Sequence, residues 1–161
     1  MIPDPPTHSK LQYCEKIGNL FSGKGSYVHN ISLDCGMGRG ISMEFRKHFP
    51  KLKTFCKNRK GRRIGMIIEY PIGKDEYVLN LISKTSYKHD PTYDNMDTAT
   101  RNLKTKCQAL GIKQLNFPKI GCGLDHMEWC IVKRMITDIF ANTDIHICVY
   151  FLPNDKDYNK H

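Results

Sequence analysis

Six short apolar runs divide the chain into candidate β-strands. They occupy residues 11–17, 26–32, 63–70, 76–83, 114–118 and 144–152. Several of these runs are apolar at consecutive positions, which is typical of strands that other elements cover on both faces. The pattern therefore predicts a sheet with helices packed against it.

Three segments between these runs repeat apolar residues at helical spacing, and each forms one apolar stripe. The stripes consist of Ile41, Phe45 and Phe49 in the first, Met96, Ala99, Leu103, Cys107 and Leu110 in the second, and Val132, Met135, Ile136, Ile139 and Phe140 in the third. Pro91 suits the first turn of the second helix, and Gly111 suits its left-handed end. Strands that alternate with helices predict an α/β domain with a parallel or mixed sheet.

The length of 161 residues and the 40% hydrophobic content fit one domain with one site. We expect a flexible N-terminal arm at residues 1–10, which hold three prolines, a domain at 11–152 and a solvated tail at 153–161. The first twenty residues lack an apolar stretch of signal-peptide length, and no window approaches the roughly 20 apolar residues of a membrane span. We expect a soluble, monomeric protein of the nucleus or the cytosol, without a membrane partner.

The cysteines and the net charge limit the kinds of site and partner that we expect. The seven cysteines are scattered and form no CxxC pair, so we expect neither a disulfide framework nor a metal site. The formal charge of +9 predicts attraction to nucleic acid or to other phosphate-bearing partners. The densest basic run, at residues 57–63, is typical of solvated surface, with polyanion contact as the alternative.

Two glycine-rich segments, at residues 32–42 and 118–125, each lie between a predicted strand and a predicted helix. Backbone N–H groups near helix N-termini favour anions, and glycine lets a phosphate approach the backbone closely. Two such loops could enclose a diphosphate, although glycine can also simply make tight turns. Neither loop has the GxGxxG or Walker spacing, which disfavours a nucleotide dehydrogenase or a kinase.

Three segments together resemble the signature segments of macrodomains. They are "ISLDCGMGRGIS", "YVLNLISKTSYKHDPTY" and "FPKIGCGLDHMEW", and the resemblance, which runs from about Tyr13 to Leu152, is strongest to the terminal ADP-ribose protein glycohydrolase branch. It implies a three-layer α/β/α sandwich around a six-stranded mixed sheet. It also implies ADP-ribose as the ligand and no metal or cofactor.

The resemblance further implies where ADP-ribose would lie. Residues 18–20 would approach the adenine, with Leu152 flanking it, and the two glycine loops would enclose the diphosphate and the distal ribose. Most members of the family have aspartate where this chain has Asn19, whose carbonyl can still accept a hydrogen bond but carries no charge. The implied contacts are Asn19, Leu20, Ser32, Gly38, Arg39, Gly40, Ser83, Lys119, Ile120, Gly121, Cys122, Gly123, Leu124 and Leu152.

The residues that carry the reaction in this branch correspond to Lys84 and Asp125. A lysine amine can attack the anomeric carbon of the distal ribose, or the aldehyde of its ring-opened form, and an aspartate can move the protons. The alternatives are an ordinary surface lysine, and a helix-capping role for Asp125, which precedes Glu128 at capping-box spacing. Asp125 would then contribute to stability instead of catalysis.

The remaining candidates fit structural roles better. His29, His89 and His126 lack metal-ligand spacing, and we interpret Cys35 and Cys122 as small loop residues because no paired histidine accompanies them. We expect a hydrolase that removes mono-ADP-ribose or terminal ADP-ribose from glutamate and aspartate side chains, and that deacylates O-acyl-ADP-ribose. Its partners would be ADP-ribosylated proteins. The alternatives are a non-catalytic reader of ADP-ribose or poly(ADP-ribose), and a basic nucleic-acid-binding protein.

Overall fold

The computed structural model describes residues 11–123 and 125–158. The expected N-terminal arm, Leu124 and residues 159–161 of the expected tail lie outside these ranges. Within the described ranges, no helix is long and apolar enough to cross a membrane.

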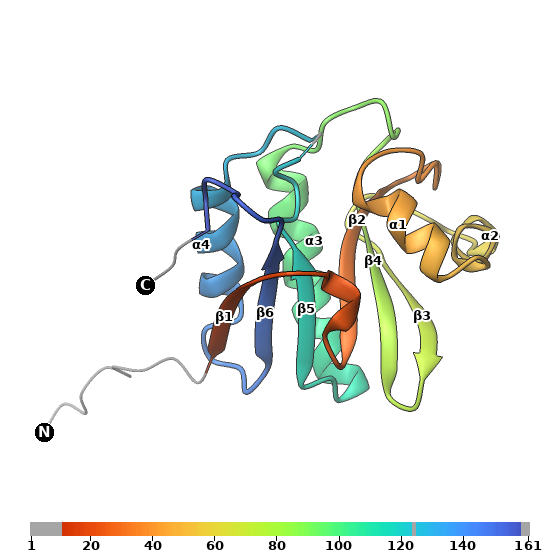
Figure 1. The fold of residues 1–161 in the computed structure, drawn as a ribbon. Helices are drawn as coiled ribbons and strands as arrows, with labels where there is room; N and C mark the ends of the chain where they lie inside the picture. The colour runs from red at the N-terminus through yellow and green to blue at the C-terminus, as the bar shows by residue number, and fades with distance from the viewer. Residues whose placement is uncertain (1–10, 124, 159–161) are drawn as a thin grey trace, which may run out of the picture.

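The described residues form six strands, four α-helices and one 3-10 helix around a single mixed sheet (Figure 1). In chain order the elements are β1 (Gln12–Ile17), η1 (Leu20–Ser22), β2 (Ser26–Ser32), α1 (Ile41–His48), α2 (Leu52–Asn58), β3 (Ile67–Gly73), β4 (Glu76–Lys84), α3 (Tyr93–Leu110), β5 (Gln114–Pro118), α4 (Trp129–Ile139) and β6 (His146–Phe151). The strand order is β1-β6-β5-β2-β4-β3. All neighbouring strands are parallel except β3 and β4, so the carboxyl ends of β2, β4, β5 and β6 meet at one edge of the sheet.

Two hydrophobic clusters, one on each face of the sheet, confirm the three-layer sandwich. Alternate residues of one strand enter opposite clusters: Val28 packs with the apolar stripes of α3 and α4, whereas Tyr27 packs with Phe45 of α1 and Leu52 of α2. Trp129 begins α4 and meets Phe151 edge-on, with ring centroids 5.5 Å apart. This contact packs α4 onto the end of β6.

The apolar pattern located most elements, and the strands at 26–32 and 114–118 have the predicted bounds. It missed α2, because this lysine-rich helix buries only Leu52 and Cys56 and so shows almost no stripe. The start of α3 also differs, because Pro91 precedes the helix and Thr92 is the N-cap, whose hydroxyl accepts from the N–H of Asn95 at 3.0 Å. Gly111 ends α3 at φ 69°, as predicted.

A buried polar network fixes α1 against the sheet. The His29 ring is fully buried, its Nε2 donates to Oδ1 of Asn80 at 2.6 Å, and its Nδ1 lies 3.1 Å from the hydroxyl of Ser42 in the first turn of α1. The same ring stacks on Phe45, with centroids 3.9 Å apart. Burial lowers the pKa of His29 to about 4, although its bond to Asn80 acts in the opposite direction. The network confirms a structural role for His29 and holds the glycine loop before α1 in place.

The chain after β6 packs back onto the domain, which differs from the expected solvated tail. Asp155 accepts from the ammonium of Lys119 at 2.9 Å, and Asp157 forms a second ion pair with the same group. The ring of Tyr158 meets Phe151 edge-on at 5.6 Å. Residues 153–158 therefore cover part of the loop that follows β5.

Candidate active site

A cleft of about 880 Å³ opens at the edge of the sheet where the parallel strands end. Its walls come from the segments after β1, β2, β4, β5 and β6. In α/β sheets, ligands bind outside the carboxyl ends of the strands, and this volume suits a ligand of nucleotide size. The fold thus places the cleft where the two glycine-rich segments meet.

The cleft brings together almost all of the candidate residues, which come from five separate segments. Those that line it are Asn19, Leu20, Ser32, Gly38, Arg39, Gly40, Lys84, Lys119, Ile120, Gly121, Cys122, Gly123, Asp125 and Leu152. Ser83 differs from the expectation, because it is fully buried in β4 and does not reach the cleft wall. Leu124 lies outside the described residues.

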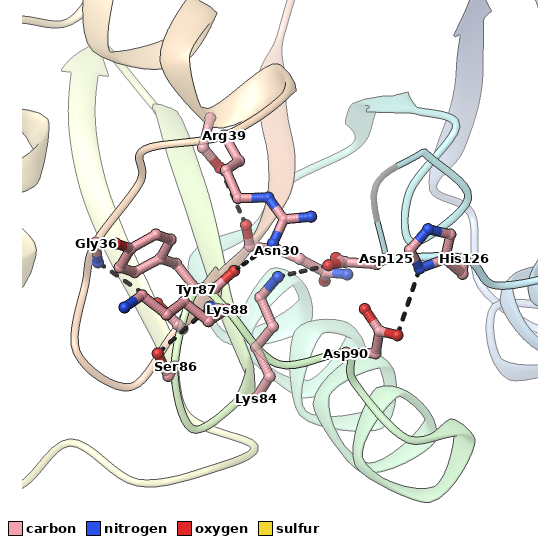
Figure 2. Close-up of polar contacts among 12 residues, drawn as sticks. Asn30, Gly36, Arg39, Lys84, Ser86, Tyr87, Lys88, Asp90, Asp125 and His126 are labelled. Atoms are coloured by element: carbon pink, nitrogen blue, oxygen red, sulfur yellow. Dashed lines mark hydrogen bonds and ion pairs between the residues drawn. The ribbon is translucent and has the colours of Figure 1, made fainter.

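Lys84 and Asp125 form an ion pair inside the cleft (Figure 2). The ammonium nitrogen lies 2.5 Å from Oδ1 of Asp125, and the two side chains are only 12% and 16% exposed. Lys84 is the last residue of β4, where it pairs with Ser32 at the end of β2. The pair is therefore held between two strand ends and the loop after β5.

The capping interpretation of Asp125 is wrong. Helix α4 begins at Trp129, its N-cap is Glu128, and no side chain caps it. Three residues separate Asp125 from the helix start, so its carboxylate is free to turn towards Lys84. The sequence predicted a helix directly after the second glycine loop. In the structure three further residues separate the loop from α4.

The loop between β2 and α1 holds its backbone in an unusual conformation. Cys35, Met37 and Gly40 have positive φ values of 55°, 47° and 59°. A left-handed residue next to a right-handed one turns successive N–H groups to one side, which is typical of concave anion sites. Two non-glycine residues in left-handed backbone also store strain, which is typical of ligand-binding loops.

The carboxylate of Asp34 stabilises this loop through hydrogen bonds. It accepts from the hydroxyl of Ser32 and, at 3.2 Å, from the backbone N–H of Gly36. Burial alone would raise the pKa of Asp34, but these bonds and others from residues 86 and 87 hold it below the usual range. Arg39 ties the loop to the β4–α3 connection by donating to the carbonyl oxygen of Tyr87 at 3.2 Å (Figure 2).

The cleft glycines fall into two kinds. Gly121 has φ 76°, and a Cβ there would lie 2.7 Å from the sulfur of Met127, so the fold itself requires glycine. Gly38 and Gly123 have no such conformation, and a Cβ at either would meet no protein atom closer than 4.0 Å. Neither backbone strain nor packing calls for glycine at these two positions, so both present bare backbone to the cleft.

The far end of the cleft is mostly aromatic and apolar. Phe21 and His48 stack there with ring centroids 3.8 Å apart, and Leu152 is 76% exposed. Asn19 is the N-cap of η1, and its Oδ1 accepts a hydrogen bond from the N–H of Phe21 at 2.9 Å. Among the described residues the amide nitrogen of Asn19 has no hydrogen-bond partner, so it is available as a donor.

Two residues that line the cleft, Asn30 and His48, were not predicted from the sequence. Asn30 sits in the middle of a strand pattern, and His48 lies in a basic stretch, so neither stood out from the ordinary composition of its element. Only the packing of β2 beside β4 and the return of α1 bring them to the cleft.

The cysteine and histidine candidates lack the surroundings of a nucleophile or a metal ligand. Burial raises the pKa of Cys122 to about 12, so its thiol is protonated at neutral pH. His126 is exposed and lies 3.4 Å from Asp90 (Figure 2), while His89 contacts the hydroxyl of Thr85 at 2.9 Å. In the part of the chain that the structure describes, no group of three or more His, Cys, Asp or Glu side chains could hold a metal ion.

Comparisons with known proteins agree with this architecture. The chain is 34% identical over 153 residues to "ADP-ribose glycohydrolase OARD1" of Homo sapiens, covering 94% of this chain and 97% of the relative. It is 25% identical over 141 residues to "DNA ADP-ribosyl glycohydrolase" of Thermus aquaticus, covering 83% of this chain but 39% of that protein. Among solved structures, the macrodomain of Thermus aquaticus DarG superposes with a TM-score of 0.80 at 22% identity, covering 88% of this chain and 99% of that one.

The family model "Macro domain" matches residues 28–136, a segment that holds Lys84, Asp125 and both glycine loops. With the three-layer fold and the 34% identical relative, this match shows that the chain belongs to the macrodomain family.

Proposed function

We propose that this protein hydrolyses the ester bond between the distal ribose of ADP-ribose and glutamate or aspartate side chains, and that it also deacylates O-acyl-ADP-ribose. The observation that carries the proposal is the Lys84–Asp125 pair at 2.5 Å inside a cleft with two glycine loops. The 34% identical human relative, named an ADP-ribose glycohydrolase, supports the same class of reaction.

The cleft offers complementary groups along its length for each part of ADP-ribose. The apolar end near Phe21 and Leu152 suits the adenine. The loop at 35–40 and the opposing glycines around Gly123 suit the diphosphate, because they provide directed backbone N–H groups and close approach. The distal ribose would then lie at the Lys84–Asp125 pair.

The reaction follows from the position of these two groups. Asp125 takes a proton from the Lys84 ammonium, and the neutral amine attacks the anomeric carbon of the distal ribose. A C–N bond forms while the C–O bond to the acyl group breaks, and its electron pair leaves with the carboxylate. Asp125 gives this proton to the solvent and then takes a proton from a water that attacks the same carbon. The C–N bond breaks with its electron pair returning to nitrogen, Asp125 returns its proton to the amine, and free ADP-ribose is released with the Lys84 ammonium regenerated.

The ring-opened sugar allows a variant of this route. It applies to an ester on a ribose hydroxyl other than the anomeric one, because an acyl group on the anomeric oxygen prevents ring opening. The amine of Lys84 adds to the aldehyde and loses water to form an imine. One water then hydrolyses the ester to a carboxylate and a free hydroxyl, and a second water hydrolyses the imine and regenerates the amine. Both routes require the amine and the carboxylate within hydrogen-bonding reach, and both pass through a covalent adduct on Lys84.

The direct test uses a protein that carries mono-ADP-ribose on glutamate. Incubation with this chain should release free ADP-ribose, and a substrate carrying serine-linked ADP-ribose provides the matched comparison, because its ether-like bond has no carboxylate leaving group. Calorimetry should show one ADP-ribose bound per chain. Tight binding of ADP-ribose without any release from the glutamate-linked substrate would make the protein a reader instead of a hydrolase.

A further inference from the structure

Asn30 carries a buried carboxamide that no described residue satisfies. The residue is 9% exposed, and neither its Oδ1 nor its Nδ2 has a hydrogen-bond partner in the described part of the chain. Buried polar groups are normally paired, so an unpaired one calls for a specific explanation. Asn30 also lines the cleft.

Another buried asparagine of the same sheet shows the usual arrangement. Asn80, which lies beside His29 in the register of β2 and β4, donates to the carbonyl of Ile68 at 2.8 Å and accepts from His29 at 2.6 Å. Asn80 therefore stabilises the fold with both ends of its amide. Asn30 has the same side chain in the same sheet but contributes none of these bonds.

The position of Asn30 points to the reacting end of the cleft. It lies on β2 two residues before Ser32, which pairs with Lys84 after a register shift between Ile31 and Ser32. Figure 2 draws the Asn30 side chain beside the Lys84–Asp125 pair, and all of these residues line one cleft. Asn30 thus lines the same cleft as the ion pair.

We propose that Asn30 binds the hydroxyl groups of the distal ribose and so determines specificity for a sugar at this position. The inference rests on the proposed function, because that function places the distal ribose at Lys84. A carboxamide offers one acceptor and two donors, and two adjacent hydroxyls, each both donor and acceptor, satisfy both ends. A phosphate would satisfy only the nitrogen, since its oxygens cannot donate to Oδ1.

This contact would also serve the reaction. Hydrogen bonds to the ring hydroxyls fix the orientation of the sugar, and the orientation decides whether the anomeric carbon faces the amine of Lys84. Asn30 is therefore a substrate-binding residue that orients the reacting carbon, and it takes no part in proton transfer.

The experiment compares ADP-ribose with ADP, which lacks the distal ribose, in the wild type, Asn30→Ala and Asn80→Ala. Asn30→Ala should weaken ADP-ribose binding about tenfold or more and change ADP binding less than about twofold, as measured by calorimetry. The melting temperature without ligand should be unchanged or raised in Asn30→Ala, because the variant removes an unpaired buried amide. Asn80→Ala, the matched control, should lower the melting temperature clearly.

The outcomes separate the two proposals. An equal loss of affinity for ADP-ribose and ADP, or no loss for either, would overturn the role of Asn30, as would a fall in melting temperature like that of Asn80→Ala. A wild type that fails to bind ADP-ribose would instead reject the proposed function, and this inference with it. In turnover, Asn30→Ala should raise KM and also lower kcat, since a misoriented sugar reacts more slowly even when bound.

Discussion

The ammonium group of Lys84 lies 2.5 Å from a carboxylate oxygen of Asp125, although the two residues are 41 positions apart. Lys84 ends the strand β4, and Asp125 follows the strand β5, which β2 separates from β4 in the sheet. The pair exists because parallel strands end at one edge, so that loops distant in sequence meet there.

The first prediction concerns this pair. Lys84→Ala should abolish turnover and yield no covalent adduct, and Asp125→Ala should lower turnover by about 10²-fold or more, the usual effect of losing a general acid–base group. Release of ADP-ribose gives the rates, and mass spectrometry detects an adduct on Lys84. Lys113→Ala, which breaks the exposed ion pair with Asp144, is the matched control and should keep wild-type turnover. Wild-type turnover in Lys84→Ala would exclude the lysine mechanism and favour a water activated by Asp125.

The second prediction separates the two kinds of cleft glycine. Gly123→Ala should weaken ADP-ribose binding by tenfold or more while leaving thermal stability nearly unchanged, because its Cβ would meet no protein atom within 4 Å. Gly121→Ala should lower the free energy of unfolding by about 1 kcal/mol or more, because its backbone has φ 76° and the new Cβ approaches Met127. Calorimetry and thermal unfolding of both variants test the distinction. Unchanged ADP-ribose affinity in Gly123→Ala would show that no ligand approaches this backbone.

The third prediction concerns acid stability. Burial lowers the pKa of His29 to about 4, whereas in the unfolded chain it is close to 6.5. Between these values the unfolded state holds a proton that the folded state lacks, so stability falls as the pH decreases. The loss between pH 7 and pH 5 should be about 2 kcal/mol. Urea unfolding measures it, and His29→Asn should remove most of this slope whatever its own stability; an equal slope in the variant would assign the effect to other groups.

The fourth prediction concerns salt. Two of the cationic side chains that line the cleft, Lys84 and Lys119, are already paired with aspartates, and Arg39 is bound to a backbone carbonyl. ADP-ribose affinity should therefore fall only about two- to threefold between about 50 mM and 200 mM salt, whereas affinity for a long polyanion such as single-stranded nucleic acid should fall far more steeply. Titrations at several salt concentrations give both slopes. Equal slopes would mean that unspecific charge attraction also dominates ADP-ribose binding.

The sequence alone determined much of the fold. Consecutive apolar residues in a strand such as β2 and regular stripes in helices such as α3 reflect burial, which is a local property of the pattern. Gly111 likewise marked a helix end by its own backbone preference. The two glycine loops could be recognised as ligand-binding candidates for the same reason, since glycine between a strand and a helix is visible without knowing what packs around it.

Only the tertiary structure decided which groups face one another. The spacing of Asp125 and Glu128 suited a cap equally well, and only the later start of α4 and the strand order direct Asp125 to Lys84. The spacing of Asn30 and Asn80 within their strands looks equivalent. Among the described residues, however, Asn80 has hydrogen-bond partners at both ends of its amide and Asn30 has none. A hydrogen bond depends on the distance and direction of atoms that the chain brings together from far apart, and the sequence by itself does not contain that geometry.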